Sequence, residues 1–153
     1  MQAGRGSMLL WAALMFGCPI SGGADAEPWR EPTTLVGGCG GGKPDQGGVR
    51  FEATHHGDAF TLEVHDDRRS FGEPTRTSYP LTAAQWSELV GIARAQDLWN
   101  WRPTSQGHPD CQTCRVSIDD HDASYCGRLD GPDRGAELRR KLESLAVAGG
   151  WTR

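Results

Sequence analysis

The clearest pattern along the chain is an alternation of apolar and polar residues over segments 49–53 (VRFEA) and 60–64 (FTLEV). Side chains of a strand point alternately to opposite faces, so each segment is expected to lay one face on a core. The polar residues 65–68 then predict a turn, and residues 69–77 predict a looser strand that returns beside the second segment.

A helix is predicted to begin at Leu81. Thr82 followed by Gln85 matches a capping box, in which each side chain satisfies a free backbone amide at the start of a helix. Four apolar residues at helical spacing predict the buried face: Trp86, Leu89, Val90 and Ala93. Residues 98–101 (LWNW) are expected to close this helix, with one tryptophan packed back and the other partly exposed.

A hairpin and a second helix are predicted after a polar loop. Residues 112–118 and 123–129 form the expected strands, and Pro132 is well placed as the first residue of the helix. Gly149 and Gly150 supply the helix stop. Three leucines at helical spacing predict the buried stripe: Leu138, Leu142 and Leu145.

Together these elements predict one α+β domain over residues 49–148, followed by a short tail at 149–153. The expected architecture has two layers, an antiparallel sheet of four to five strands with two helices on one face. Residues 62–71 and 116–125 share an apolar-x-apolar start, an acidic turn and a Ser-aromatic end. This similarity suggests two ββα units, although any two hairpins can look alike over ten residues.

Residues 1–26 have the three parts of a secretion signal. Arg5 lies in a short polar start, residues 8–16 (MLLWAALMF) are apolar, and residues 24–26 (ADA) form an A-x-A end. The apolar run is shorter than the ~20 residues that span a bilayer. Cleavage between Ala26 and Glu27 is therefore expected, in preference to a buried N-terminal helix.

Residues 14–18 (LMFGC) offer a second processing route. They resemble a bacterial lipobox, in which the cysteine, here Cys18, becomes the lipid-bearing first residue of the mature protein. The two routes predict different locations. Cleavage after Ala26 predicts a secreted or periplasmic protein, and lipidation of Cys18 predicts a membrane-tethered lipoprotein with no other membrane attachment.

Residues 27–48 are rich in glycine and proline and are interpreted as a linker. Residues 37–43 (GGCGGGK) nearly match a phosphate-binding loop, but Pro44 replaces the Ser/Thr that such a loop needs to bind magnesium. No helix pattern follows, so a glycine tether that carries a disulfide is the preferred interpretation.

The four cysteines after Cys18 form an even set, which in an exported protein indicates disulfides. The first pairing considered joins Cys114 to Cys126 across the predicted hairpin and Cys39 to Cys111. The competing pairing joins Cys111 to Cys114 and Cys39 to Cys126.

Two functional roles for the cysteines compete with disulfides. Cys111 and Cys114 form a C-x-x-C motif, but the residues after it alternate like a strand, whereas a redox motif favours a helix N-terminus. A zinc site would use Cys111, Cys114 and Cys126 with His108 or His121, but no second C-x-x-C or spaced histidine pair completes it.

The chain of 153 residues has a net charge of −4, and no basic stripe stands out, so nucleic-acid binding is not expected. It contains no G-x-S-x-G, H-E-x-x-H or strand–G-x-G-x-x-G–helix signature. The alternative to a non-catalytic protein is a metal-dependent protein or enzyme. Its metal site would lie at the hairpin turns and consist of His65, Asp66, Asp120 and His121. No other cofactor is expected.

The helix that begins LTAAQW at residues 81–86, followed by a strand pair and a last helix, resembles small exported bacterial domains of unknown function. The layout over residues 49–146 is also loosely similar to emfourin-type metalloprotease inhibitors. The predicted first strand is not glycine-rich and the cysteines differ, so no functional residue is transferred. The sequence therefore predicts an exported, disulfide-stabilised, non-catalytic module that binds or inhibits a protein or envelope partner.

Overall fold

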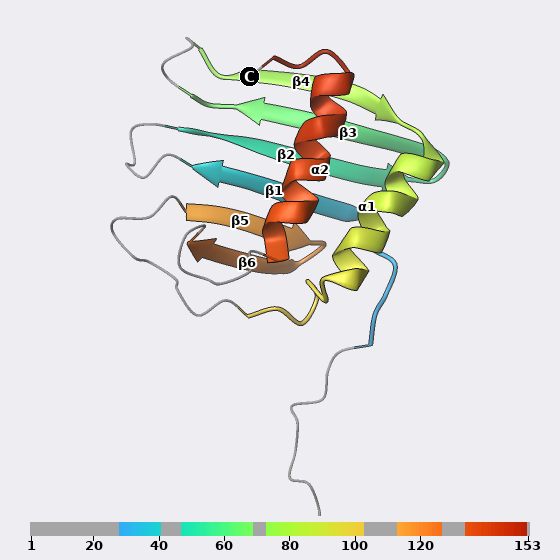
Figure 1. Cartoon of the computed structure of the whole chain (residues 1–153). Coiled ribbons are helices and arrows are strands. Elements are labelled where there is room, and N and C mark those ends of the chain that lie inside the picture. Colours follow the sequence, from blue (N-terminus) through green and yellow to red (C-terminus); the bar gives the residue numbers. More distant parts are fainter. Residues whose placement is uncertain (1–27, 41–46, 69–72, 103–112, 127–133, 153) are drawn as a thin grey trace, which may run out of the picture.

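A computed structural model of the chain describes residues 28–40, 47–68, 73–102, 113–126 and 134–152. Six strands form one antiparallel sheet in the order β4-β3-β2-β1-β5-β6, and both helices cover the same face (Figure 1). The α+β class and the two layers are confirmed, with six strands in place of four to five. The elements are β1 Thr34–Gly40, β2 Gly48–His56, β3 Ala59–Asp66, β4 Thr75–Leu81, α1 Ala83–Ala95, β5 Thr113–Ile118, β6 His121–Cys126 and α2 Arg134–Ala148.

The hairpin of β2 and β3 contains the two alternating segments of the sequence. Phe51 lies opposite Val64 and Ala53 opposite Leu62, and all four side chains are buried against the helices. Gly57, at φ +60°, lies in the tight turn that joins the strands. The polar positions between them therefore point to the other face of the sheet.

The prediction of a linker over residues 27–48 is wrong for Thr34–Gly40, because this segment is the central strand β1, paired with β2 on one side and β5 on the other. Glycine normally weakens a strand. Here a Cβ on Gly37 would lie 3.2 Å from Cα of Arg139 in α2, and a Cβ on Gly38 only 2.6 Å from the carbonyl oxygen of Val49. Close packing, and not flexibility, accounts for these two glycines. The first strand of the sheet in chain order is therefore β1, which is glycine-rich, and not the predicted strand at residues 49–53.

Strand β3 continues to Asp66, so the polar turn begins later than residues 65–68, and β4 begins only at Thr75. Leu81 is the last residue of β4 and not the first of a helix. The capping box itself is confirmed. The backbone N–H of Gln85 donates to Oγ1 of Thr82 (3.2 Å), and the backbone N–H of Thr82 donates to Oε1 of Gln85 (2.8 Å).

Tryptophan side chains fill the core between helix α1 and the sheet. Trp86 is 2% exposed, as its predicted role in the core requires. Trp99 and Trp101 are also buried, which corrects the expectation that one of them is partly exposed. Trp101 packs on the ring of Tyr125, and Trp99 packs against the ring of His121 with centroids 4.1 Å apart.

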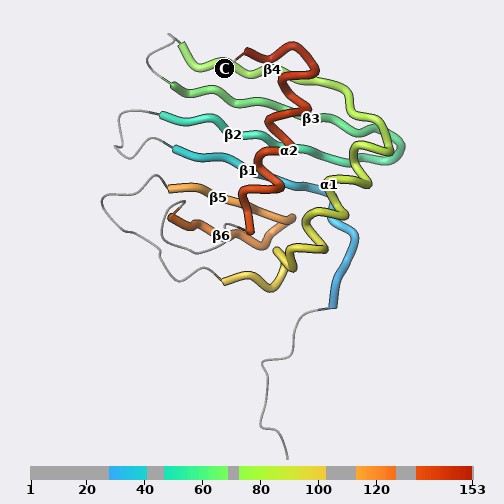
Figure 2. The backbone as a smooth tube through the Cα atoms, viewed as in Figure 1, coloured from blue at the N-terminus to red at the C-terminus, as the bar shows by residue number. Residues whose placement is uncertain are grey.

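Helix α2 crosses the middle of the sheet, and the tail after it returns toward β4 (Figure 2). The predicted leucine stripe is buried, and Gly149 and Gly150 end the helix in a turn. A Cβ on Gly149 would lie 2.6 Å from the ring of Tyr79, so glycine allows this close return. Lys141 of α2 forms an ion pair with Glu88 of α1 (2.6 Å), which ties the two helices together.

The strand order agrees in topology with two ββα units. The strand pairs β3-β4 and β5-β6 lie on opposite sides of the central β1–β2 pair, and β3 and β5 run in opposite directions. The helices do not keep to these sides, because α2 contacts β1, β2 and β3 as well as β5. The buried pairs Leu62/Val64 and Val116/Ile118 occupy equivalent strands. The Ser-aromatic part of the first segment, residues 70–71, lies outside the described residues.

Candidate binding surface on the open face of the sheet

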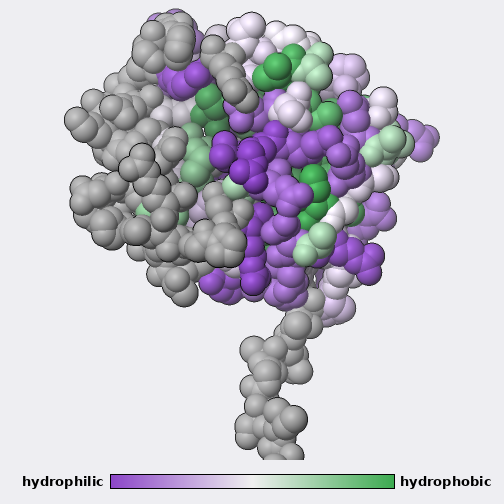
Figure 3. Space-filling view, in the orientation of Figure 1, coloured by the Kyte–Doolittle hydropathy of each residue, from purple (hydrophilic) through white to green (hydrophobic). Residues whose placement is uncertain are grey.

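The face of the sheet opposite the helices is not covered by any element that the structure describes. On the other side, the outer surface of the helix layer is largely hydrophilic (Figure 3), and Val147 is the exposed large apolar side chain among the described residues. Neither helix therefore offers a broad apolar surface for docking. The opposite side of the sheet, called the open face, carries the side chains of Arg50, Arg76 and Arg115.

A row of basic side chains crosses five strands of the open face. Arg76 lies opposite His65, His65 opposite Arg50, and Gly38 lies between Arg50 and Arg115. Residues directly opposite each other in a sheet point to the same side. The arginines thus belong to alternate strands of the sheet, β4, β2 and β5.

An acidic row runs beside the basic row and neutralises it in three places. Nη2 of Arg50 lies 2.6 Å from Oε2 of Glu52, and Nε of Arg115 lies 2.5 Å from Oδ1 of Asp122. Arg76 forms the third pair with Glu63. Its side-chain hydrogen bonds hold the pKa of Glu63 below the ordinary value.

The arginine side chains are much more exposed than the carboxylates that they contact. Arg76, Arg50 and Arg115 are 66, 55 and 61% exposed. Their partners, Glu63, Glu52 and Asp122, are 26, 24 and 38% exposed in the same order. A molecule that approaches the open face therefore meets guanidinium groups first, held in place by carboxylates.

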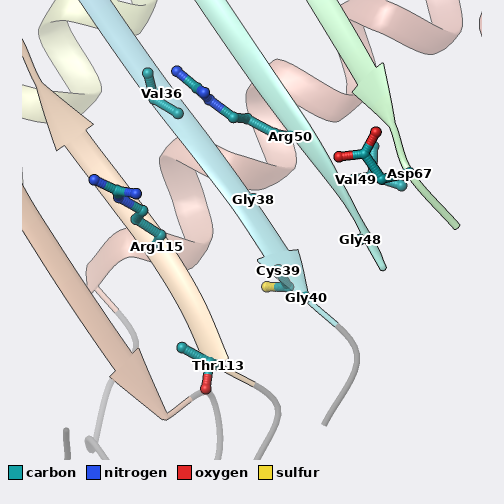
Figure 4. A pocket seen from close by; sticks show the side chains of 10 residues that line it. All are labelled: Val36, Gly38, Cys39, Gly40, Gly48, Val49, Arg50, Asp67, Thr113 and Arg115. Carbon is teal, nitrogen blue, oxygen red and sulfur yellow. The ribbon is translucent and has the colours of Figure 1, made fainter. Parts of the chain in front are cut away.

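A shallow pocket of about 180 Å³ lies over β1 on this face, toward the edge of the sheet where β1 ends and β2 and β5 begin. Gly38, Gly40 and Gly48 leave its floor without side chains, and Arg50 and Arg115 flank it from β2 and β5 (Figure 4). In Figure 4 both arginine side chains extend along the strands toward the end of β1 that carries Val36. Asp67 and Thr113 also line the pocket.

The disulfide Cys39–Cys114 joins β1 to β5 beside this pocket. The two residues are direct register partners with Cα atoms 4.0 Å apart. This finding overturns both pairings considered from the sequence, since one joined Cys114 to Cys126 and the other joined it to Cys111. The turn at residues 119–120 has two residues, which places Cys114 opposite Tyr125 and not Cys126.

Cys126 is also disulfide-bonded, and because Cys39 and Cys114 bond to each other, its partner lies outside the described residues. Cys111, Cys18, Ala26 and Glu27 lie outside them too. With Cys114 and Cys126 both oxidised, neither the C-x-x-C redox motif nor the cysteine zinc site is formed.

The four residues of the metal hypothesis do not meet. His65 and Asp66 lie at one end of β3, whereas Asp120 and His121 lie at the opposite end of the sheet, in and after the β5–β6 turn. Antiparallel pairing separates the two turns, because β3 and β5 run in opposite directions. Within the residues that the structure describes, no group of three or more His, Cys, Asp or Glu side chains is placed to hold a metal ion.

Asp66 and His121 instead have local partners. Arg68 donates from Nε (2.9 Å) and Nη2 (2.5 Å) to the Asp66 carboxylate, and these hydrogen bonds lower the pKa of Asp66. The ring of His121 packs on Trp99. Both residues therefore contribute to structure at the positions where the sequence suggested ligands.

Sequence reasoning missed Arg50, Arg76 and Arg115 as site residues. The only local signal was the set of polar positions in alternating segments, which any solvent-facing strand shares. Their alignment depends on the register of strands that lie far apart in the sequence.

The fold and this surface define a two-layer α+β domain with one open, charged sheet face. No protein-family model and no curated protein sequence matches the chain. None of the helices in the described part of the chain combines the length and apolar character needed to cross a membrane.

Proposed function

We propose that the protein is an exported, non-catalytic module that binds or inhibits a protein partner at the cell envelope or outside it, through the open face of its sheet. The observation that carries this proposal is the row of three exposed arginines, each held by a carboxylate on the same face. Side chains fixed before binding lose less conformational entropy when a partner docks.

Support for export comes from the cysteines. The Cys39–Cys114 disulfide joins strands 75 residues apart in the sequence, and such bonds persist mainly in oxidising compartments. Intact-mass measurement of the protein from its own envelope fraction tests this part. A mature chain that starts at Glu27 supports secretion, and an acylated chain that starts at Cys18 supports a tethered lipoprotein. A chain that retains residues 1–17 would contradict export.

Site-specific photo-crosslinking tests the binding surface. Ser78 on the open face and Ser144 on α2 are both exposed serines and form a matched pair of positions for a photoreactive residue. With the protein in its native envelope fraction, we expect a discrete adduct from position 78 and none from position 144. Adducts of equal yield from both positions would contradict an interface on the open face.

A further inference from the structure

The spacing of the three arginines across the sheet is regular and is similar to the repeat of an extended peptide. Arg76, Arg50 and Arg115 lie in one row on the first, third and fifth strands of the order β4-β3-β2-β1-β5. Neighbouring strands lie about 4.8 Å apart, so the backbone positions that carry the arginines recur about every 10 Å across the sheet. This distance is close to one turn of a polyproline II segment, which has three residues per turn and rises about 3.1 Å per residue.

From this register we infer that the open face binds an extended acidic segment of a partner protein, with Asp or Glu at every third residue, laid across the strands along the arginine row. The inference rests on the proposed function and specifies the chemistry of its ligand. Each carboxylate of such a segment would face one arginine, and the residues between would point away from the sheet.

The arginines retain the donors that this recognition needs. A guanidinium has five N–H donors in a rigid fork that matches a carboxylate. The ion pair to Glu52 engages Nη2 of Arg50, and the ion pair to Asp122 engages Nε of Arg115. Donors on both side chains thus remain for a second carboxylate. Arg76 donates to Glu63 from Nε and Nη2 and keeps the donors of its Nη1 group.

The pocket places a recess between two of these arginines. Gly38 carries no side chain, so the backbone of the segment can approach β1 between the two carboxylates that face Arg50 and Arg115. Asp67 lies at the edge of the same pocket, and its negative charge would repel an anion placed there. Because the acidic row is less exposed than the arginines, the outer part of the face remains favourable to negative charge.

The test measures binding of two labelled peptides to the full chain with its disulfides formed. Both are proline-rich and contain three Glu; one has them at every third residue, and the other has the same composition with the three Glu adjacent. We expect the spaced peptide to bind about ten-fold more tightly at low salt, and added salt to weaken it. Equal affinities, or no binding of either peptide, would overturn the inference.

Variants identify the surface that the spaced peptide uses. R50Q/R76Q/R115Q is expected to lower its affinity about ten-fold or more, whereas R140Q, which removes an exposed arginine on α2, is expected to leave it unchanged. R50K/R76K/R115K keeps the charge and loses the fork, so an intermediate affinity is expected even if the Gln variant folds poorly. Unchanged affinity in the Lys variant, or equal losses in R140Q, would contradict the inference.

Two other occupants of the face would give different results. If the open face binds a second copy of the chain, sedimentation would show a dimer, and R50K/R76K/R115K would weaken it. The two peptides would then bind equally well. This outcome overturns the acidic-segment proposal. A crosslink from position 78 that persists while no acidic peptide binds would leave the proposed function standing and remove only this inference.

Discussion

Arg50 and Arg115 lie on opposite sides of the same residue, because each is a register partner of Gly38. Both side chains point to the open face, where the missing side chain of Gly38 leaves a recess between them. A glycine in the central strand therefore has two consequences. It lets β1 pack tightly against β2, and it turns two separate surface arginines into the walls of one pocket.

The first prediction concerns the two glycines of the pocket floor in β1. In G38A the new Cβ would lie 2.6 Å from the carbonyl oxygen of Val49, so backbone must shift, and we expect a loss of about 1–3 kcal/mol in the free energy of unfolding. In G40A the nearest atom is 4.0 Å away, and a change within about 0.5 kcal/mol is expected. Urea unfolding measures both, and equal effects would contradict close packing at Gly38.

The second prediction concerns the disulfide between β1 and β5. C39A/C114A is expected to lower the free energy of unfolding by about 2–5 kcal/mol, because the bond closes a loop of 75 residues in the unfolded chain. Proteolysis without reduction should release a linked peptide pair that contains Cys39 and Cys114. Fragmentation between residues 111 and 114 assigns each bond, and a bond between Cys114 and Cys126 would instead restore the pairing considered from the sequence.

The third prediction concerns a bond between the β5–β6 turn and the start of β1. Oδ1 of Asp119 accepts hydrogen bonds from the backbone N–H groups of Thr33 and Thr34, both at 2.9 Å, and from Oγ1 of Thr33 at 3.0 Å. Asp119 also has φ +50°, a conformation that Asp and Asn tolerate better than other side chains.

D119A removes this acceptor and is expected to cost about 1–3 kcal/mol of stability. D119N keeps one oxygen acceptor and the tolerated backbone conformation, so most of the stability should remain. Thermal or urea unfolding compares the two variants. A D119N variant as unstable as D119A would show that the negative charge, and not the acceptor geometry, accounts for the effect.

The fourth prediction concerns acid stability. Arg68 lowers the pKa of Asp66, and Arg76 lowers the pKa of Glu63, so the folded protein binds protons at these carboxyls less readily than the unfolded chain does. The stability that they contribute is fully present at neutral pH and is lost as the pH falls below about 4.5, through the depressed folded-state pKa values.

D66N is expected to be less stable at pH 7, by less than about 1 kcal/mol for this partly exposed pair, and to lose less stability between pH 7 and pH 3. Urea unfolding at both pH values measures the difference. D58N, which removes an exposed carboxyl from the β2–β3 turn, is the matched control. The same pH dependence in D66N and in the unsubstituted protein would contradict the assignment.

Several local features followed from the sequence because their causes are local. The capping box of Thr82 and Gln85 involves residues three apart, and the leucine stripe of α2 repeats within one helix. The alternating segments of β2 and β3 are neighbours joined by a tight turn, so their pairing needed no long-range information. Each of these elements lies where its pattern predicted it within a few residues.

The elements that the sequence did not reveal depend on contacts between distant segments. Glycines at residues 37, 38 and 40 indicated a tether, because nothing nearby shows that α2 and the backbone of β2 exclude side chains at two of them. One of Trp99 and Trp101 was predicted to be partly exposed, because the partners that bury both rings, His121, Tyr125 and Trp29, come from β6 and the N-terminal segment.

The sequence by itself determined the α+β class, the capping box of α1 and the buried faces of both helices, since periodicity and capping act within a few residues. Only the tertiary structure decided that β1 is the central strand, that Cys39 bonds to Cys114, and that three arginines form one row. The physical reason is register. A shift of one residue in the pairing of a strand moves every side chain to the other face, and no local pattern determines that shift between strands that are far apart in the chain.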